Sequence, residues 1–186
     1  GSDTQGSTGT QSDENIKLEN ETLTISVVGE VTSDMISPYK SAVRNVILND
    51  TVTSIGTEAF LNCRALKSVE VSKNVGSIGR GAFADCTSLK EIVFKGLPTI
   101  DKENVVFSGL NTTIYYPLSE SGWQSIVSNK SSSTYQGATN IEWVGYNYFT
   151  YCGNKNQTGG RNLIDIINEV SNSEYELSII KSKAAD

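Results

Sequence analysis

Apolar and polar positions repeat along the middle of the chain with an offset of 23 residues. The stretch "TSIGTEAFLNC" begins at Thr53, and "GSIGRGAFADC" begins at Gly76 with Ser, Ile, Gly, Ala, Phe and Cys in register. The match continues past the cysteines, where Leu66 corresponds to Leu89. A fixed period of about 20 to 50 residues is typical of a solenoid, in which each coil stacks on the previous one.

Each repeat contains a short stretch in which apolar and polar residues alternate, as they do in a half-buried strand. The three stretches are residues 43–48, 66–71 and 89–94. Stacked in register, they are expected to form a parallel sheet with one strand per coil. Between the strands, Ala59-Phe60 and Ala82-Phe83 are expected to point one small and one large side chain into the core.

The cysteines fit the same repeat. Cys63 and Cys86 occupy one repeat position, and Leu110 takes that position in a third, more degenerate coil. Because the position also accepts Leu, we expect both cysteines to be buried as small apolar groups. Stacking in register points their side chains in parallel, which favours free thiols over a disulfide. Cys152 has no counterpart in the repeat and is predicted to be a third free thiol.

The two clear copies carry the pattern S-I-G-x-x-A-F-x-x-C-x-x-L. This pattern resembles the BspA-like (Treponema-type) leucine-rich repeats of bacterial surface proteins. The resemblance implies an α/β repeat solenoid: a short leucine-rich repeat with a parallel strand face, an N-terminal β-hairpin cap and a mixed C-terminal cap. It also implies a secreted or surface-anchored bacterial protein that binds through the repeat face, with adhesion as the role associated with larger members.

The repeats divide the chain into five expected parts. In the N-terminal cap, Leu23, Ile25 and Val27 are expected to cover the open end of the solenoid, and Pro117 is expected to end the last strand. The parts are a disordered polar linker (1–15), the N-terminal cap (16–43), the repeats (44–117), the C-terminal cap (118–145) and an extension that resembles nothing recognised (146–186). The extension contains one predicted short helix, residues 163–170.

Charge and composition narrow the function. The chain has 15 Lys and Arg against 21 Asp and Glu, a net charge of −6, and no histidine. A nucleic-acid binder normally presents a basic face, so we expect no nucleic-acid partner. The usual general base and the commonest metal ligand are both missing, and no catalytic constellation is present, so we expect no enzyme activity, no cofactor and no metal site. No stretch approaches the ~18 apolar residues of a membrane span.

Outward positions of the predicted strands are candidate ligand-binding residues. Among them, Ile47, Val93 and Tyr115 are expected to align in one column that Glu70 interrupts. A charged residue in place of Val93 or Tyr115 is then expected to abolish recognition and leave the fold intact. An ordinary solvated sheet face with scattered apolar residues is the alternative, and both interpretations remain open. The candidates are Ile47, Glu70, Glu91, Val93, Lys95 and Tyr115.

The size of this face limits what it can bind. Four strands make a face of roughly 200–300 Å², whereas a stable protein interface needs ~800 Å² per partner. Binding is therefore weak and multivalent, or directed at a small ligand, or supported by other residues. Tyr146, Tyr148 and Tyr151, near Trp143, are candidates for extra aromatic contact. The favoured interpretation is that these aromatic residues pack against the last coil as a cap.

Two hypotheses of function follow. The first is a secreted or cell-surface anchored binding module that recognises protein or glycan on a host or neighbouring cell. The alternative is a structural spacer or accessory domain with no ligand of its own. The polar start of the chain, "GSDTQGSTGTQSDEN", resembles a mature stalk, so the targeting segment is expected to lie outside this sequence. A tag remnant followed by an ordinary terminus is the other interpretation of this start.

Overall fold

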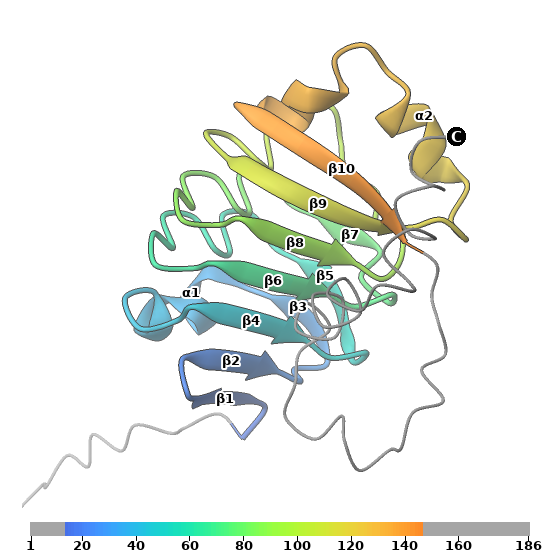
Figure 1. Ribbon diagram of the computed structural model, residues 1–186. Coiled ribbons are helices and arrows are strands. Elements are labelled where there is room, and N and C mark those ends of the chain that lie inside the picture. The colour runs from blue at the N-terminus through green and yellow to red at the C-terminus, as the bar shows by residue number, and fades with distance from the viewer. Residues whose placement is uncertain (1–13, 147–186) are drawn as a thin grey trace, which may run out of the picture.

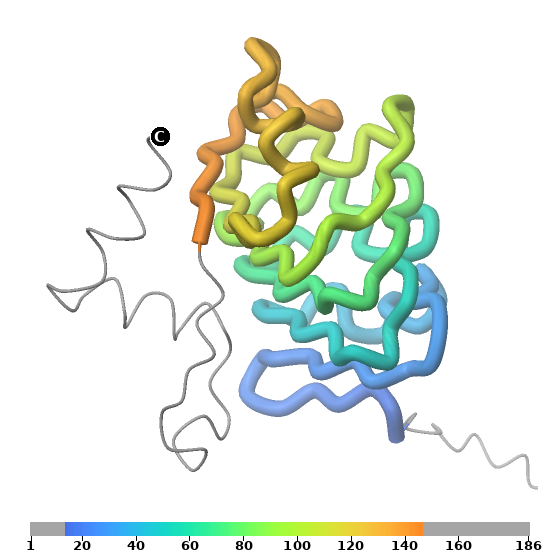
Figure 2. Tube along the Cα trace, turned by 90° about the vertical axis from the view of Figure 1, so that its right-hand side faces the viewer, coloured from blue at the N-terminus to red at the C-terminus, as the bar shows by residue number. Residues whose placement is uncertain are grey.

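The computed structural model describes residues 14–146, which wind into one stack of coils (Figure 1). Seen from the side, the trace rises coil by coil from the N-terminal to the C-terminal end (Figure 2). Expectations about residues 1–13, Tyr148, Tyr151, Cys152 and the helix at 163–170 lie outside the described residues. The solenoid predicted from the repeat is confirmed.

The coils build two sheets. The main sheet has the order β1-β2-β4-β6-β8-β9-β10, and a smaller sheet behind it in Figure 1 has the order β3-β5-β7. The main sheet consists of β1 (Ile16–Glu19), β2 (Thr22–Ile25), β4 (Asn45–Leu48), β6 (Ser68–Val71), β8 (Glu91–Phe94), β9 (Asn111–Pro117) and β10 (Asn140–Tyr146). The smaller sheet consists of β3 (Gly29–Val31), β5 (Val52–Ile55) and β7 (Ser77–Ile78). The helical segments are α1 (Ser33–Ile36), η1 (Ser37–Tyr39), α2 (Gly122–Val127) and η2 (Ser132–Gly137).

The register of the main sheet follows the sequence repeat. Val46 pairs with Val69 in parallel, and Val69 pairs with Ile92. These positions correspond in the 23-residue repeat, so β4, β6 and β8 follow one another in the same phase. At the N-terminal end, β1 pairs with β2 in antiparallel fashion. This hairpin places Leu23 and Ile25, both 0% exposed, over the end of the core as the sequence predicts.

A third side of each coil consists of stacked turns. The backbone N–H of Phe60 donates to the Ala82 oxygen at 2.8 Å, and the N–H of Phe83 donates to the Val106 oxygen at 3.1 Å. Backbone groups of the turns are therefore satisfied by the next coil rather than by water.

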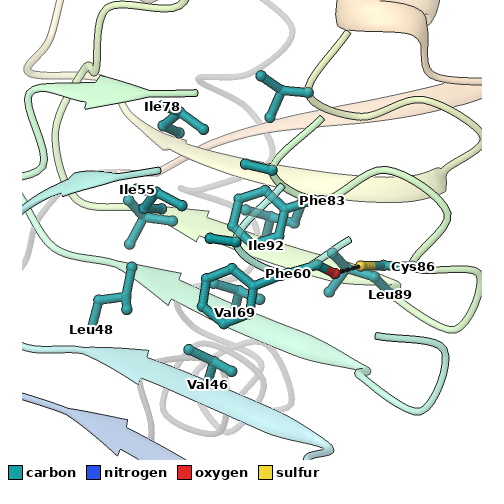
Figure 3. Packing of buried hydrophobic residues seen from close by; sticks show 14 of the residues in the cluster. Val46, Leu48, Ile55, Phe60, Val69, Ile78, Phe83, Cys86, Leu89 and Ile92 are labelled. Carbon is teal, nitrogen blue, oxygen red and sulfur yellow. Dashed lines mark hydrogen bonds between the residues drawn. The ribbon is translucent and has the colours of Figure 1, made fainter. Parts of the chain in front are cut away.

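Aromatic rings stack through the centre of the solenoid. The rings of Phe60 and Phe83 lie parallel with centroids 5.2 Å apart, and the Phe83 and Phe107 centroids are 6.4 Å apart. Ala59 and Ala82, both fully buried, leave room beside these rings. Figure 3 shows Phe60 and Phe83 one above the other among aliphatic residues of the strands. The predicted alternation of small and large inward groups is confirmed.

The prediction for Cys63 and Cys86 is also confirmed. Cys63 and Cys86 are free and fully buried. The Cys86 thiol donates to the Phe60 carbonyl oxygen at 3.0 Å (Figure 3). A hydrogen bond with Cys63, together with burial, raises the pKa of Cys86 above the usual value of a thiol. This thiol therefore stays protonated and packs as a small apolar group.

The main sheet continues beyond the strand that was expected to be the last. β9 does end at Pro117, but β10 adds to it in parallel, with Asn140 paired to Asn111. The N–H of Phe107 donates to the Gln136 oxygen at 3.0 Å, so η2 forms the turn side of this additional coil. The coil is longer than 23 residues and lacks the S-I-G-x-x-A-F signature, so the repeat could not reveal it. β10 also crosses the expected boundary between residues 145 and 146.

One turn position adopts a left-handed backbone in successive coils. Glu58 has a φ of 56°, and the equivalent Gly81 has a φ of 60°. A residue with a Cβ is strained there by about 1–2 kcal/mol, whereas glycine is not. Because Glu58 is exposed, Glu58→Gly removes the strain without opening a cavity. We expect it to raise the free energy of unfolding by about 0.5–1 kcal/mol, measured by chemical denaturation.

The neighbouring exposed residue Thr57 provides the control, since its φ is not positive. Thr57→Gly only increases the freedom of the unfolded chain, so it is expected to lower the free energy of unfolding by about 0.5–1 kcal/mol. Equal effects of the two glycine substitutions would contradict the strain argument.

Candidate binding face

The side of the main sheet that points away from the interior cluster is called the outer face here. On it, Ile47 pairs with Glu70, Glu70 with Val93, and Val93 with Tyr115. The predicted alignment is therefore present, with Glu70 inside the column. Val144 of β10 extends it, because Val144 pairs with Tyr115. These five residues are called the central column.

Two members of the column are not available at the surface. Glu70 is 3% exposed and Val93 is 0% exposed, whereas Ile47 and Tyr115 are partly exposed. The alternation of the sequence predicts the direction of a side chain, but not what covers it. The expectation that a charge at Val93 would leave the fold intact is wrong, because an uncompensated charge would be buried there.

Glu70 is held by Lys95, which directly follows the neighbouring strand β8. The Lys95 Nζ lies 3.4 Å from Glu70 Oε1, and their side chains are 21% and 3% exposed. A carboxylate this deeply buried requires such compensation. Lys95 is therefore committed to an ion pair within the face, which leaves Glu91 as the partly exposed acidic candidate.

A second, polar column runs beside the central one. It contains Asn45, Ser68, Glu91 and Thr113, each paired with the next across adjacent strands. The Ser68 hydroxyl donates to the Asn45 side-chain oxygen at 2.6 Å. Ser68 is also nearly buried, at 6% exposure. This bond holds Asn45 and Ser68 together at one end of the polar column.

Tyr115 is the aromatic group of the central column. Burial raises its pKa above the usual value of tyrosine, and the charges of Glu91 and Glu142 raise it further. The phenol is therefore neutral throughout the physiological range of pH. A neutral, partly exposed ring flanked by carboxylates can pack against an apolar side chain or the face of a sugar, while the carboxylates accept hydrogen bonds.

Tyr146 has a structural partner on the same face. In two other strand pairs, the N–H of Asn49 donates to the Ile25 oxygen and the N–H of Lys95 donates to the Val71 oxygen. The equivalent residue of β9 is Pro117, which has no N–H, so the carbonyl oxygen of Phe94 lacks its ladder partner. The Tyr146 hydroxyl, on the far side of β9, donates to this oxygen at 2.5 Å. Tyr146 is 4% exposed and lies outside the interior cluster.

Removing this hydroxyl tests its role. Tyr146→Phe leaves the Phe94 carbonyl buried without its donor, so we expect the free energy of unfolding to fall by about 1–3 kcal/mol in chemical denaturation. Tyr115→Phe is the control, because within residues 14–146 the Tyr115 hydroxyl has no hydrogen-bond partner. An equal loss in both variants would contradict the assignment.

The strands beyond the four counted from the sequence, β1, β2 and β10, enlarge the outer face. Seven strands at ~4.8 Å spacing span roughly 29 Å, and a strand of four residues is about 13 Å long, which gives on the order of 400 Å². This area is larger than the sequence predicted but still about half of what a stable protein interface needs per partner.

Other kinds of site were sought in the same part of the chain. Within residues 14–146, no group of three or more Cys, Asp or Glu side chains is placed to hold a metal ion. No helix of this described part is long and apolar enough to cross a membrane.

Comparison with known proteins identifies related repeats. A family model described as the BspA type leucine-rich repeat region matches residues 37–156. Two similar solved structures are a leucine-rich repeat protein from Eubacterium ventriosum, 28% identical with a TM-score of 0.39, and a leucine-rich cell surface protein from Faecalibacterium prausnitzii, 18% identical with a TM-score of 0.32. The matches cover 57% and 74% of this chain but only 37% and 50% of those chains. No curated protein matches the sequence.

Proposed function

Since the chain belongs to the BspA-type leucine-rich repeat family, we propose that it is a binding module of a secreted or cell-surface protein. The outer face of the main sheet is its recognition surface. One observation carries this proposal: five adjacent parallel strands align Ile47, Tyr115 and Val144 in one column beside a fixed polar column. The partner is a protein or glycan on a host or neighbouring cell.

The chemistry of the face supports a partner that is neutral and partly apolar. Ile47 and Tyr115 offer partly exposed apolar surface, and Glu91 lies beside Tyr115 as a hydrogen-bond acceptor. The net charge of −6 does not favour a nucleic acid. We therefore propose contact by Ile47, Glu91 and Tyr115, with Glu70, Val93 and Lys95 supporting them from within the sheet.

The limited area sets the strength of binding. A face on the order of 400 Å² supplies only about half of a standard interface. A single copy is therefore expected to bind weakly, and several copies on one surface to bind by avidity. Multivalent display suits a module at a cell surface, where many copies meet many partners.

A spacer function is the second candidate, and a specific observation favours it. Several outward side chains are already engaged within the sheet, as in the bond from Ser68 to Asn45 and the ion pair of Lys95 with Glu70. Coils stacked through backbone hydrogen bonds make a stiff element without needing a ligand. We propose no catalytic activity for either function.

Binding of clustered protein to an array separates the two functions. The full chain, displayed as a tetramer on streptavidin, is applied to arrayed matrix proteins and glycans, with the untethered monomer in parallel. The binding function predicts retention of the tetramer on a defined subset and little or no retention of the monomer. Failure of the tetramer to bind any arrayed component above a streptavidin control would support the spacer and contradict the binding function for these partner classes.

A further inference from the structure

The first strand, β1, leaves one edge of the main sheet open. The order of the sheet begins with β1, which pairs with β2 on one side, and no strand of residues 14–146 pairs with its other side (Figure 1). Lys17, Leu18 and Glu19 are all exposed along this edge. An open edge presents backbone N–H and C=O groups that can pair with a further strand.

The pairing of β1 with β2 shows which backbone groups point to the open edge. The N–H of Ser26 donates to the Asn15 oxygen at 2.7 Å. These two residues lie opposite each other, since the register pairs Ile16 with Ile25. Bonded and non-bonded positions alternate along an antiparallel pair. Leu18, three residues after Asn15, is therefore at a non-bonded position toward β2, and its N–H and C=O point to the open edge.

Leu18 adds an apolar group at the same place. It pairs with Leu23, whose side chain is 0% exposed, so Leu18 lies on the interior side of the sheet. It is nevertheless 36% exposed and outside the interior cluster. A strand added to β1 would cover this side chain and remove its apolar surface from water.

The charges of β1 fit a second copy of the same strand in one register. Alternation of bonded positions places the axis of an antiparallel twofold pair at a residue rather than between two residues. An axis at Leu18 places Lys17 of each copy opposite Glu19 of the other copy. An axis at Lys17 or at Glu19 places two like charges opposite each other, which is unfavourable.

We propose that two copies of the chain pair through β1, antiparallel and centred on Leu18, and so form one continuous sheet. The two Leu18 residues exchange both backbone hydrogen bonds and bury their side chains against each other. The two pairs of Lys17 with Glu19 lie on the outer face, because they alternate with Leu18 along the strand.

The contact is one short strand wide, so the association is weak and a dilute chain is a single copy. Side chains that lie opposite each other in an antiparallel pair share a face. Both outer faces therefore point to the same side of the joined sheet, and a partner meets twice the area of one copy. That last consequence alone rests on the proposed function.

Sedimentation of the full chain over a series of concentrations tests the association. We expect the average mass to rise from that of one chain at about 10 µM toward that of two chains at about 1 mM. Lys17→Glu and Glu19→Lys each place like charges opposite each other and are expected to lower the association constant about fivefold or more. The double variant restores opposite charges and is expected to return to within about twofold of the unaltered chain.

The two single variants change the net charge in opposite directions, so a loss in both does not come from overall repulsion. Lys130→Glu is the control, because Lys130 is exposed and lies just after α2, at the other end of the stack. We expect it to leave the association constant within about twofold. A mass of one chain up to about 1 mM, an equal loss in Lys130→Glu, or no recovery in the double variant would overturn the proposal.

Disulfide trapping determines the register. In the proposed pair, position 17 lies opposite position 19 of the second copy, with Cα atoms about 4.5 Å apart, within reach of a disulfide. Lys17→Cys and Glu19→Cys chains, both carrying Cys152→Ser, are mixed and oxidised at high concentration. This combination keeps one pair of Lys17 with Glu19 intact. We expect the mixed disulfide to exceed either homodimer about fivefold or more.

Predominance of either homodimer, or equal yields of the three products, would contradict the axis at Leu18. Neither sedimentation nor trapping involves an outside ligand. Failure of this pairing is therefore distinguishable from failure of the proposed binding function.

Discussion

Phe83→Ala is expected to lower the free energy of unfolding by about 3–5 kcal/mol, because it removes the middle ring of the aromatic stack. The Phe83 ring lies 5.2 Å from Phe60 and 6.4 Å from Phe107, and it has no exposed surface. Truncation leaves a cavity between two coils that the backbone hydrogen bonds hold at a fixed spacing. The cavity therefore cannot collapse, and the loss of stability is expected to be large for the truncation of a buried phenylalanine.

Chemical denaturation followed by tryptophan fluorescence measures this loss. A loss of 3–5 kcal/mol can exceed half of the stability of a domain, so Phe83→Ala is paired with Phe83→Leu. The leucine keeps most of the volume, and we expect it to cost about 1–2 kcal/mol. A loss below about 1 kcal/mol in the alanine variant would mean that the coils do not depend on the central ring.

Gly79→Ala is expected to be the second severe change, at about 2–4 kcal/mol, because a Cβ at this position strikes the backbone of the preceding coil. An added Cβ would lie 2.5 Å from the Thr57 nitrogen and 2.8 Å from the Gly56 carbonyl carbon. These are main-chain atoms, so no side chain can rotate away. The N–H of Gly79 also donates to the Ile55 oxygen at 2.8 Å, and separating the coils would weaken that bond.

Gly76, on the other side of the short strand β7, is the matched control. A Cβ there would have only the Thr53 oxygen nearby, at 3.8 Å, an ordinary contact. Gly76→Ala is expected to leave stability unchanged or to raise it by up to about 1 kcal/mol, because alanine restricts the unfolded chain. Thermal unfolding measures the melting temperatures of the Gly79→Ala and Gly76→Ala variants. Equal melting temperatures for the two variants would contradict the close approach of the coils at Gly79.

The repeat predicted the parts of the fold that obey its period. Positions separated by 23 residues occupy the same place in successive coils, so the pairing of Val46, Val69 and Ile92 followed from the sequence. The burial of Cys63 and Cys86 followed for the same reason, since Leu110 fills their position in the next coil. A repeated pattern determines strand register because a slip of one residue would turn every apolar side chain outward.

The parts that depart from the period could not be predicted. β10 belongs to a coil of different length, and its alternation of Ile141 and Trp143 with polar residues is too short to distinguish from a capping strand. The sequence also does not predict the hydrogen bond from the Tyr146 hydroxyl to the Phe94 carbonyl oxygen. It depends on Pro117 lacking an N–H and on a strand whose pairing the sequence did not reveal. Pro117 is the one signal in the sequence, and by itself it indicates only where β9 ends.

The candidate face was predicted in direction but not in exposure. The column through Ile47, Glu70, Val93 and Tyr115 is aligned as expected. Strand periodicity determines which side of a sheet a residue occupies, whereas exposure depends on what lies above that side. For this reason the burial of Glu70 and Val93 was missed, and the contact residues proposed for an outside partner are now fewer.

Comparison of two charge-matched variants tests the central claim that the outer face is the recognition surface. Tyr115→Lys adds a positive charge to the outer face, and Thr53→Lys adds the same charge to an exposed position on the smaller sheet. Each variant, displayed as a tetramer, is measured against the array component that retains the unaltered chain, after thermal unfolding has confirmed that both are folded. Our account predicts that Tyr115→Lys weakens binding about tenfold or more, while Thr53→Lys changes it less than about twofold. Unchanged binding of Tyr115→Lys, or an equal loss in both variants, would contradict it.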